Sequence, residues 1–325
     1  NNSLLQTEYW GRLKSEFGWQ VFAYACTYLQ IQFTLLVLVR KLTGVFHLAY
    51  VPHGPDCQVP GVKQSELLQL LSKRLKKYLP GNTVVLRWDP KWSVAGEGKP
   101  YPAFTPPLKK AVMDIQPPNT VVVNLEQSED EILKAMKSKT RYNVRLAAKK
   151  GVTVRKASFD EYDTWYNIYQ ETAQRDKIAI HSAEYYKKVW ELAWETEDMD
   201  ITLLFAEHEG EVLAGNFIAL NKEHSVYLYG ASSGKKRSLM PAYALQWEAM
   251  KLAKSAGCTE YDLFGIPPKP DKDHPMYGLY RFKTGFGGQI RNMPGAWDYP
   301  LSLLYPVFRL AERLRKWYFK SFQRR

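Results

Sequence analysis

Cysteine and histidine are scarce in this 325-residue sequence, and they are not grouped. The three cysteines, Cys26, Cys57 and Cys258, lie far apart without a CxxC pair, and the six histidines form no HExxH motif. These absences exclude a cysteine-rich zinc module, and we expect neither a catalytic metal nor another bound cofactor. Such sparse use of cysteine is typical of a reducing compartment.

Long hydrophobic runs are missing as well. The longest apolar stretch, Ile31–Val39, is interrupted by Gln32 and Thr34, is too short to span a bilayer and is typical of a buried strand. No basic segment near the start leads into an apolar stretch of the signal-peptide form, so we expect a cytoplasmic location. P-loops, strand-linked GxGxxG turns and GxSxG nucleophile elbows are also absent, which argues against the enzyme classes that carry them.

Positive charge and aromatic residues are abundant. Lys and Arg number 45 against 33 Asp and Glu, which gives a formal net charge of +12, and the chain has ten Trp and 21 Tyr. A surplus of this size favours anionic partners such as nucleic acid, nucleotide phosphates or acidic lipid surfaces. With 45% hydrophobic residues, the length predicts a globular chain of two domains.

One order of predicted elements occurs twice. Residues 18–51 read as three strands of a meander, residues 62–79 have helical spacing, and residues 83–88 form another strand. The same order returns over residues 201–265, with Pro241 at the first turn of the helix. Such a repeat indicates a duplicated domain. It resembles the central part of the GNAT-type acyltransferase fold, which implies an α/β protein with mixed sheets in two tandem GNAT-type domains.

The chain between the repeats is predicted to be mostly helical and basic. Ser128 and Glu131 have the spacing of a capping box, and residues 134–156 hold nine Lys or Arg and no acidic residue. Residues 90–118 are rich in Pro and Gly and are predicted to be a loop with one short helix near residues 108–113. Further helices are predicted over residues 160–175 and 183–195 and, with amphipathic spacing, after Pro300.

Residues 279–288 (LYRFKTGFGG) combine cations with aromatic rings. On an extended segment alternate residues share a face, so Arg281 and Lys283 would point one way and Phe282 the other. A cation on a poorly solvated aromatic face stabilises a developing oxyanion better than a cation in water. From residue types alone, a basic edge strand with ordinary aromatic packing is the favoured alternative.

Six segments, in order along nearly the whole chain, resemble the signature of the Fem family of peptidoglycan-bridge aminoacyltransferases. The resemblance implies two tandem GNAT-type domains, in agreement with the repeat. Some members insert a helical hairpin, for which no charged stretch here is long enough, so the chain resembles the compact members. The segments are 6–14 (QTEYWGRLK), 50–55 (YVPHGP), 140–145 (TRYNVR) followed by 149–151 (KKG), 229–232 (YGAS), 261–266 (YDLFGI) and 280–288 (YRFKTGFGG).

The resemblance also implies an activity, the transfer of an amino acid from aminoacyl-tRNA to the stem-peptide amine of a UDP-linked or lipid-linked peptidoglycan precursor. The aminoacyl ester is already activated, so neither ATP nor a metal is needed. Lys283 would stabilise the tetrahedral oxyanion, Phe282 would shape the site for the tRNA end, and Asp89 would accept a proton or orient the amine. Asp89 also fits a plain turn carboxylate before Pro90.

Binding residues follow from the same resemblance. Lys14 and Arg175 would hold the diphosphate and carboxylates of the precursor, and Tyr229 would line the peptide groove. Solvated surface positions for the two cations, and a position at the rim of the core for the tyrosine, remain alternatives. At the place where the family has an Arg followed four residues later by Tyr, this chain has His181 and Tyr185. The expected precursor-binding residues are Lys14, Arg175, His181, Tyr185, Tyr229 and Arg281.

The basic stretch 134–156 and the basic tail have two interpretations each. The stretch would either face tRNA phosphates or form a solvated helix face. The tail, with Trp317 and Tyr318 and the nearby Phe319 and Phe322, would either touch the anionic cytoplasmic face of a membrane or pack through Leu301, Leu304 and Phe308 on the first domain. The expected tRNA-binding residues are Lys137, Lys139, Arg145, Lys149 and Lys150.

We expect a monomer whose first domain, residues 1–124 with 295–325, binds the precursor and whose second domain, residues 125–294, carries out acyl transfer. Three other functions stay open. An acetyl-CoA-dependent N-acyltransferase would need a glycine-rich pyrophosphate turn, and residues 236–240 lack those glycines. An aminoacyltransferase acting on lipid or on a protein N-terminus, and a basic RNA-binding module without enzymatic activity, are the other two.

Overall fold

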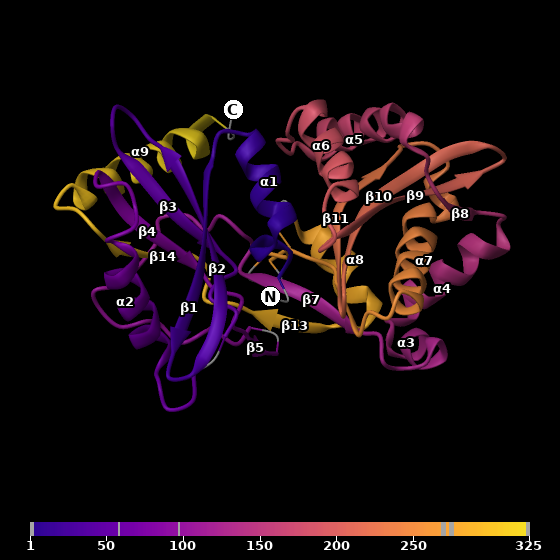
Figure 1. Cartoon of the computed structure of the whole chain (residues 1–325). Helices are drawn as coiled ribbons and strands as arrows, with labels where there is room; N and C mark the ends of the chain where they lie inside the picture. The colour runs from indigo at the N-terminus through magenta and orange to yellow at the C-terminus, as the bar shows by residue number, and fades with distance from the viewer. Residues whose placement is uncertain (1–2, 58, 97, 268–270, 273–275, 323–325) are drawn as a thin grey trace.

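Two mixed β-sheets flanked by helices form the framework of the protein in the computed structural model (Figure 1). The structure describes residues 3–57, 59–96, 98–267, 271–272 and 276–322. Within these ranges, no helix combines the length and the apolar character that crossing a bilayer requires. The predicted α/β class with mixed sheets is confirmed.

The first sheet has the strand order β1-β2-β3-β4-β14-β6. Its first three strands pair antiparallel, and β3 pairs parallel with β4 after the connecting helix α2 (Gln64–Leu75). Apolar residues of these strands and the inner face of α2, including Leu68 and Leu71, form the core of this unit. The strands are β1 (Gln20–Tyr28), β2 (Ile31–Lys41), β3 (His47–Pro52), β4 (Thr83–Asp89), β6 (Lys109–Lys110) and β14 (Trp297–Pro300).

The second sheet repeats this pairing pattern. Its order is β5-β13-β7-β12-β11-β10-β9-β8, and β9, β10 and β11 pair antiparallel before α7 (Pro241–Ser255) leads to the parallel strand β12. The repeated order of three strands, helix and strand is therefore present in both sheets. The strands are β5 (Val94–Ala95), β7 (Asn119–Asn124), β8 (Thr153–Lys156), β9 (Asp200–His208), β10 (Glu211–Asn221), β11 (His224–Ser232), β12 (Glu260–Asp262) and β13 (Gln289–Asn292).

Strands β5, β7 and β14 each pair in a different sheet from the strand that precedes them in the chain. The predicted boundary after residue 124 assigns β5 and β7 to the first domain, but β7 pairs with β12 and β13, and β5 pairs with β13, in the second sheet. The pairing of these two strands thus differs from the predicted boundary, because the partners of β7 lie far along the chain and no local pattern reveals them. In the other direction, β14 pairs with β4 and β6 in the first sheet.

Two segments that were predicted to be helical contain strands. The capping box of Ser128 and Glu131 is present, but the basic stretch 134–156 divides between helix α4 and strand β8. The short helix expected near residues 108–113 is wrong, since Lys109 and Lys110 pair with β14 as strand β6. The remaining helices are α1 (Glu8–Glu16), α3 (Glu129–Ala135), α4 (Ser138–Lys149), α5 (Tyr162–Asp176), α6 (Ala183–Glu191), α8 (Tyr277–Lys283) and α9 (Tyr305–Phe322).

Helix α1 lies between the two sheets and joins them (Figure 1). Its residues Tyr9 and Leu13 belong to one apolar cluster with Leu36 of β2 and with Trp165 and Tyr186 of the second unit. The Tyr9 hydroxyl also donates a hydrogen bond of 2.6 Å to the carbonyl of Val189 in α6. One core, which we call the shared core, therefore spans both units and fixes α1 against α6.

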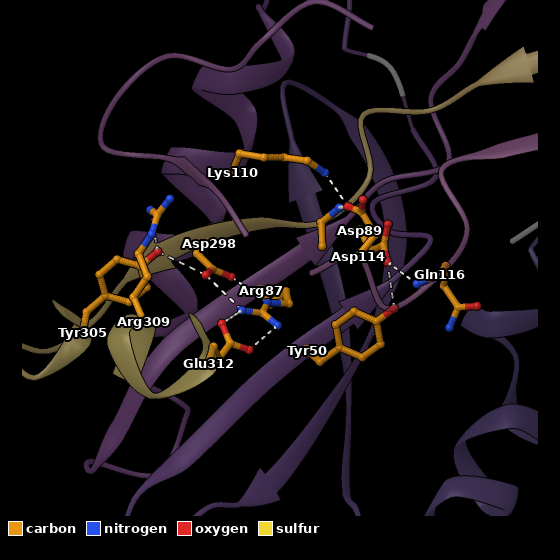
Figure 2. Close-up of polar contacts among 11 residues, drawn as sticks. Tyr50, Arg87, Asp89, Lys110, Asp114, Gln116, Asp298, Tyr305, Arg309 and Glu312 are labelled. Carbon is orange, nitrogen blue, oxygen red and sulfur yellow. Dashed lines mark hydrogen bonds and ion pairs between the residues drawn. The ribbon is translucent and has the colours of Figure 1, made fainter. Parts of the chain in front are cut away.

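A buried ion network attaches α9 to the first sheet (Figure 2). Arg87 of β4 contacts Asp298 of β14 at 2.7 Å and Glu312 of α9 at 2.7 Å, and the Tyr305 hydroxyl donates to Asp298 at 3.1 Å. The side chains of Arg87 and Asp298 are almost fully buried. Each charge therefore relies on its partners to offset the loss of hydration.

Arg87→Met should lower the free energy of unfolding by about 3–5 kcal/mol, because it leaves two carboxylates in the protein without their cation. Urea denaturation followed by tryptophan fluorescence measures the change. Arg12→Met is the matched control, since Arg12 pairs with Glu8 at the surface, and its effect should stay below about 1 kcal/mol. Equal losses in the two variants would contradict a structural role for the buried network.

Candidate active site

Lys283 ends α8 with its side chain buried, at 5% exposure. Its Nζ donates to the carbonyl oxygens of Phe264 at 3.2 Å and Gly265 at 2.9 Å, and it lies 5.4 Å from the centre of the Tyr227 ring. Burial lowers the pKa of Lys283 to about 7, and the Asp262 carboxylate acts weakly in the opposite direction. The amine can therefore gain and lose a proton near neutral pH.

The predicted extended form of this segment is wrong. Residues 277–283 form a helix, so Arg281 and Lys283 lie on different faces, with Arg281 exposed and Lys283 buried beside Tyr280. Phe282 is half-buried and packs on Tyr243 at 5.1 Å between ring centres. The alternation of four residues was too short to distinguish a strand from a helical turn.

The carbonyls that accept from Lys283 belong to a tight turn at the end of β12. Phe264 has a φ of +58°, a left-handed conformation that costs a bulky residue about 1–3 kcal/mol. A Cβ at Gly265 would stand 2.4 Å from Pro117, so glycine is required for this close approach. The turn thus directs two carbonyls at one amine while pressing against the segment before β7.

Asp89 ends β4, where its side chain is buried with two hydrogen-bond donors. Its Oδ2 accepts from the Tyr50 hydroxyl at 3.0 Å and from the backbone N–H of Gln116 at 3.2 Å (Figure 2). Burial raises the pKa of Asp89 to about 7, although these two hydrogen bonds act in the opposite direction. Gln116 precedes Pro117, which contacts Gly265, so one dipeptide connects the surroundings of Asp89 with those of Lys283.

Lys14 meets Tyr185 and His181 where α1 faces α6. Lys14 Nζ donates to the Tyr185 hydroxyl at 2.9 Å and lies 4.2 Å from the centre of the Trp10 ring, and His181 stacks on Tyr185 with 4.1 Å between ring centres. Burial lowers the pKa of Lys14 to about 8, and nearby Arg40 acts in the same direction. This cation is therefore held on an aromatic wall between the two units and is not a solvated surface charge.

Tyr229 extends the same aromatic wall. Its ring packs against Tyr186 with 4.9 Å between ring centres, and its hydroxyl lies close enough to Tyr185 for a hydrogen bond to contribute to both pKa values. Burial raises the pKa of Tyr229 well above its ordinary value. The structure thus brings together four of the six predicted precursor-binding residues, Lys14, His181, Tyr185 and Tyr229.

The other two predicted precursor-binding residues have different surroundings. Arg175, near the end of α5, donates to the carbonyl of Ser232 at 2.7 Å and pairs with Asp176 at 3.0 Å. Its guanidinium therefore fixes the end of β11 to α5. Arg281 lies on the exposed side of α8.

The five predicted tRNA-binding residues are exposed along α4 and at its ends. Lys137 connects this basic face to the segment after Lys283, because its Nζ donates to Thr284 at 3.2 Å and its backbone N–H donates to the Gly285 carbonyl at 2.9 Å. The basic face of α4 therefore continues to the residues that directly follow the buried lysine.

Several residues that contact Lys283 or Asp89, or that position α4, were not predicted from the sequence. Tyr227 lies under Lys283, and Tyr50 and Gln116 donate to Asp89. Arg141 donates to three carbonyls at the end of α3 and so fixes the corner between α3 and α4. Its place inside the 140–145 segment was the one available signal. Within the described ranges, no three His, Cys, Asp or Glu side chains are grouped so that they could hold a metal.

Comparison with known proteins decides the family. The model of the FemAB family matches residues 104–203 and 195–313. The chain belongs to the FemAB family. The lipid II:glycine glycyltransferase of Staphylococcus aureus strain COL is 25% identical over 97% of this chain and 91% of its own length, and that of Staphylococcus epidermidis strain RP62A is 24% identical over the same shares. The first alignment spans 392 positions against 325 residues here, so that relative has segments that this FemAB protein lacks.

Solved structures show the same fold. A crystal structure of FemX superposes with a TM-score of 0.81 at 22% identity and covers 95% of each chain. The C-terminal domain of a putative lysylphosphatidylglycerol synthetase from Agrobacterium fabrum has a TM-score of 0.54 at 10% identity, with 90% of this chain and 87% of that one covered. The predicted Fem resemblance and fold are confirmed, and this FemAB protein is a transferase.

Asp89→Asn should change how stability depends on pH. In the folded protein the pKa of about 7 keeps the carboxyl protonated at pH values where the unfolded chain, with its ordinary pKa of 3.8, is ionised. The folded state then binds more protons, so the free energy of unfolding falls as pH rises from about 4 to about 7. At about 1.4 kcal/mol per pKa unit the fall amounts to a few kcal/mol, and asparagine should abolish it.

Urea midpoints measured between about pH 4 and pH 8 test this expectation. Asp163→Asn, which alters an exposed carboxylate on α5, serves as the control and should keep the wild-type slope. The same slope in wild type and Asp89→Asn would show that Asp89 is ionised in the folded protein.

Proposed function

We propose that this FemAB protein transfers an amino acid from aminoacyl-tRNA to the stem-peptide amine of a peptidoglycan precursor. The observation that carries the proposal is the buried cation Lys283. The two residues that follow it, Thr284 and Gly285, accept hydrogen bonds from Lys137, which lies between α3 and α4. The names of the relatives, lipid II:glycine glycyltransferases, support an acceptor of the same class.

The donor tRNA binds along the basic face of α4. Lys139, Arg145 and Lys149 meet its phosphates, and Lys137 leads toward Thr284 beside the buried lysine. Tyr142 is 62% exposed on the same helix and offers a ring on which an unpaired base stacks. An aminoacyl ester at the end of such a strand is thereby brought toward Lys283.

The acceptor binds on the aromatic wall between the two units. Lys14 there is a partly desolvated cation that donates one N–H to the Tyr185 hydroxyl at 2.9 Å. Its other two N–H groups are available to a phosphate or carboxylate. His181 and Tyr229 add flat apolar surface for the stem peptide.

Transfer begins when the neutral acceptor amine attacks the ester carbonyl, which forms the C–N bond and places negative charge on the carbonyl oxygen. The Lys283 ammonium stabilises this oxyanion with its third N–H, since two are directed at Phe264 and Gly265. The bond to the ribose oxygen then breaks. Asp89 takes the proton that the amine loses and returns it to the ribose oxygen, for which a pKa of about 7 is well suited.

Lys283→Ala should lower turnover roughly 100- to 1000-fold with little change in precursor affinity, the usual cost of losing one oxyanion donor. Lys283→Arg should recover part of the rate, because a broad planar cation does not fit the place of a compact one. Lys14→Ala should instead raise the Michaelis constant for the precursor at nearly constant turnover. Steady-state transfer of radiolabelled amino acid, with precursor concentration varied, measures both constants.

Lys73→Ala is the control for the lysine variants, because it removes an exposed cation from α2, outside the proposed precursor and transfer sites, and should leave both constants nearly unchanged. Near-normal turnover of Lys283→Ala, with weaker precursor binding, would make Lys283 a contact to the precursor. The oxyanion would then need a different donor.

The affinity for tRNA should fall steeply with salt, because Lys and Arg contacts to phosphate release counterions. Changing Lys139, Arg145 and Lys149 together to Glu should weaken binding and reduce the slope of log affinity against log salt by about three. Fluorescence anisotropy with aminoacyl-tRNA at 50–200 mM salt, roughly the range where such binding changes most, measures the slope. Lys73, Lys76 and Lys77 changed to Glu make the matched control, with the same charge change at the end of α2 and in the turn that follows it. Similar slopes in both triple variants would leave α4 as a solvated face.

A further inference from the structure

Helix α9 packs on the protein through two aromatic residues near its start and through polar residues beyond them. Tyr305 and Phe308 pack with Val84 and Val85, as one interpretation of the tail predicted for Phe308. Glu312 on its inner side contacts Arg87, and Lys316 Nζ donates to the carbonyl of Val112 at 2.7 Å (Figure 2 shows the first of these contacts). Tyr305, at the start of the helix, adds a buried hydrogen bond to Asp298. A surface helix of a globular protein ordinarily buries its apolar side, so beyond Phe308 the arrangement of α9 is reversed.

The outward side of α9 is apolar. Val307, Leu310 and Leu314 are spaced by three and four residues, which places them on one face, and their exposed fractions are 65%, 56% and 59%. Trp317 continues this face at 68% exposure, and Leu303, just before the helix, is 98% exposed. We call these five residues the outer face of α9. A contiguous apolar stripe of this kind marks a surface that another apolar body covers.

The charge around this stripe indicates what that body is. Residues 305–325 contain seven Lys or Arg and one Glu, and that Glu312 is paired with buried Arg87. Exposed Arg313 and Arg315 flank the apolar stripe on its two sides. An apolar stripe with such a basic rim, and with Trp on the apolar side, matches a lipid surface with anionic headgroups. Two copies of this chain, each at +12, would instead bring like charges together.

We propose that the outer face of α9 lies on the surface of an anionic lipid bilayer, with the helix parallel to the membrane plane. The apolar side chains enter the boundary between headgroups and acyl chains, and Arg313 and Arg315 contact the headgroups. The Arg87 network holds the helix in this orientation, because it fixes the opposite side of α9 to the first sheet. Insofar as the proposed function holds, this contact brings the enzyme to a lipid-linked acceptor.

Cosedimentation of the full chain with vesicles tests the proposal. Wild type should bind vesicles of phosphatidylcholine with phosphatidylglycerol and bind pure phosphatidylcholine much more weakly. Leu314→Glu should reduce the affinity for the anionic vesicles roughly tenfold or more, the loss expected when a leucine side chain no longer leaves water. Leu29→Glu is the matched control, since Leu29 is 62% exposed in the turn between β1 and β2, and it should bind like wild type.

Failure of wild type to bind anionic vesicles, or equal losses in the two variants, would overturn the proposal. So would a wild-type dimer that Leu314→Glu separates in sedimentation velocity, because the outer face would then cover a second copy. Circular dichroism confirms that both variants stay folded.

A transfer assay separates this proposal from the proposed function. Leu314→Glu should keep the wild-type rate on a water-soluble precursor peptide and lose rate on a lipid-linked precursor in vesicles. Absence of transfer by wild type on either acceptor would contradict the proposed function and leave the vesicle result standing by itself.

Discussion

The shared core around α1 is the contact on which the rest of the structure depends. Leu36 and Tyr9 of the first unit belong to one buried apolar cluster with Trp165 and Tyr186 of the second. Because α1 is fixed in this way, Lys14, which directly follows the buried Leu13, donates a hydrogen bond to Tyr185. Tyr185 and Tyr229, which lie far from Lys14 in the sequence, thereby form one aromatic wall beside it. The burial of apolar surface in the shared core determines where this wall lies.

Two buried ionisable groups show how the same physical cause gives opposite chemical results. Burial disfavours charge, so it lowers the pKa of Lys283 and raises the pKa of Asp89, and both approach neutrality. In each case the protein retains the group by supplying hydrogen-bond partners, carbonyls for the amine and donors for the carboxyl. Paired groups tuned from opposite directions are typical of acid–base and electrostatic catalysis.

The sequence allowed much of the fold to be predicted, because local signals specify most of its elements. Pro241 begins a helix where predicted, and Ser128 caps one. Features that depend on distant partners were not predictable. The predicted boundary placed residues 119–124 in the first domain, whereas β7 pairs in the second sheet with β12, which lies far along the chain. Residues 277–283 were read as extended because four alternating residues fit both structures. The same holds for the candidate site. The motif at 280–288 singled out Lys283, but no local sequence pattern indicates that Gln116, in a loop, donates to Asp89.

The position of β14 has a consequence for how the protein is made. This strand lies between β4 and β6, so the first sheet stays incomplete until residues 297–300 have left the ribosome. Until then the edge of β4 offers unpaired backbone groups to any neighbouring strand, and Arg87 has neither of its carboxylate partners. The N-terminal unit therefore cannot mature ahead of the C-terminal one, as domains usually do during synthesis. The emergence of residues 297–300, and not that of the first half of the chain, sets the moment at which this protein acquires its native first sheet.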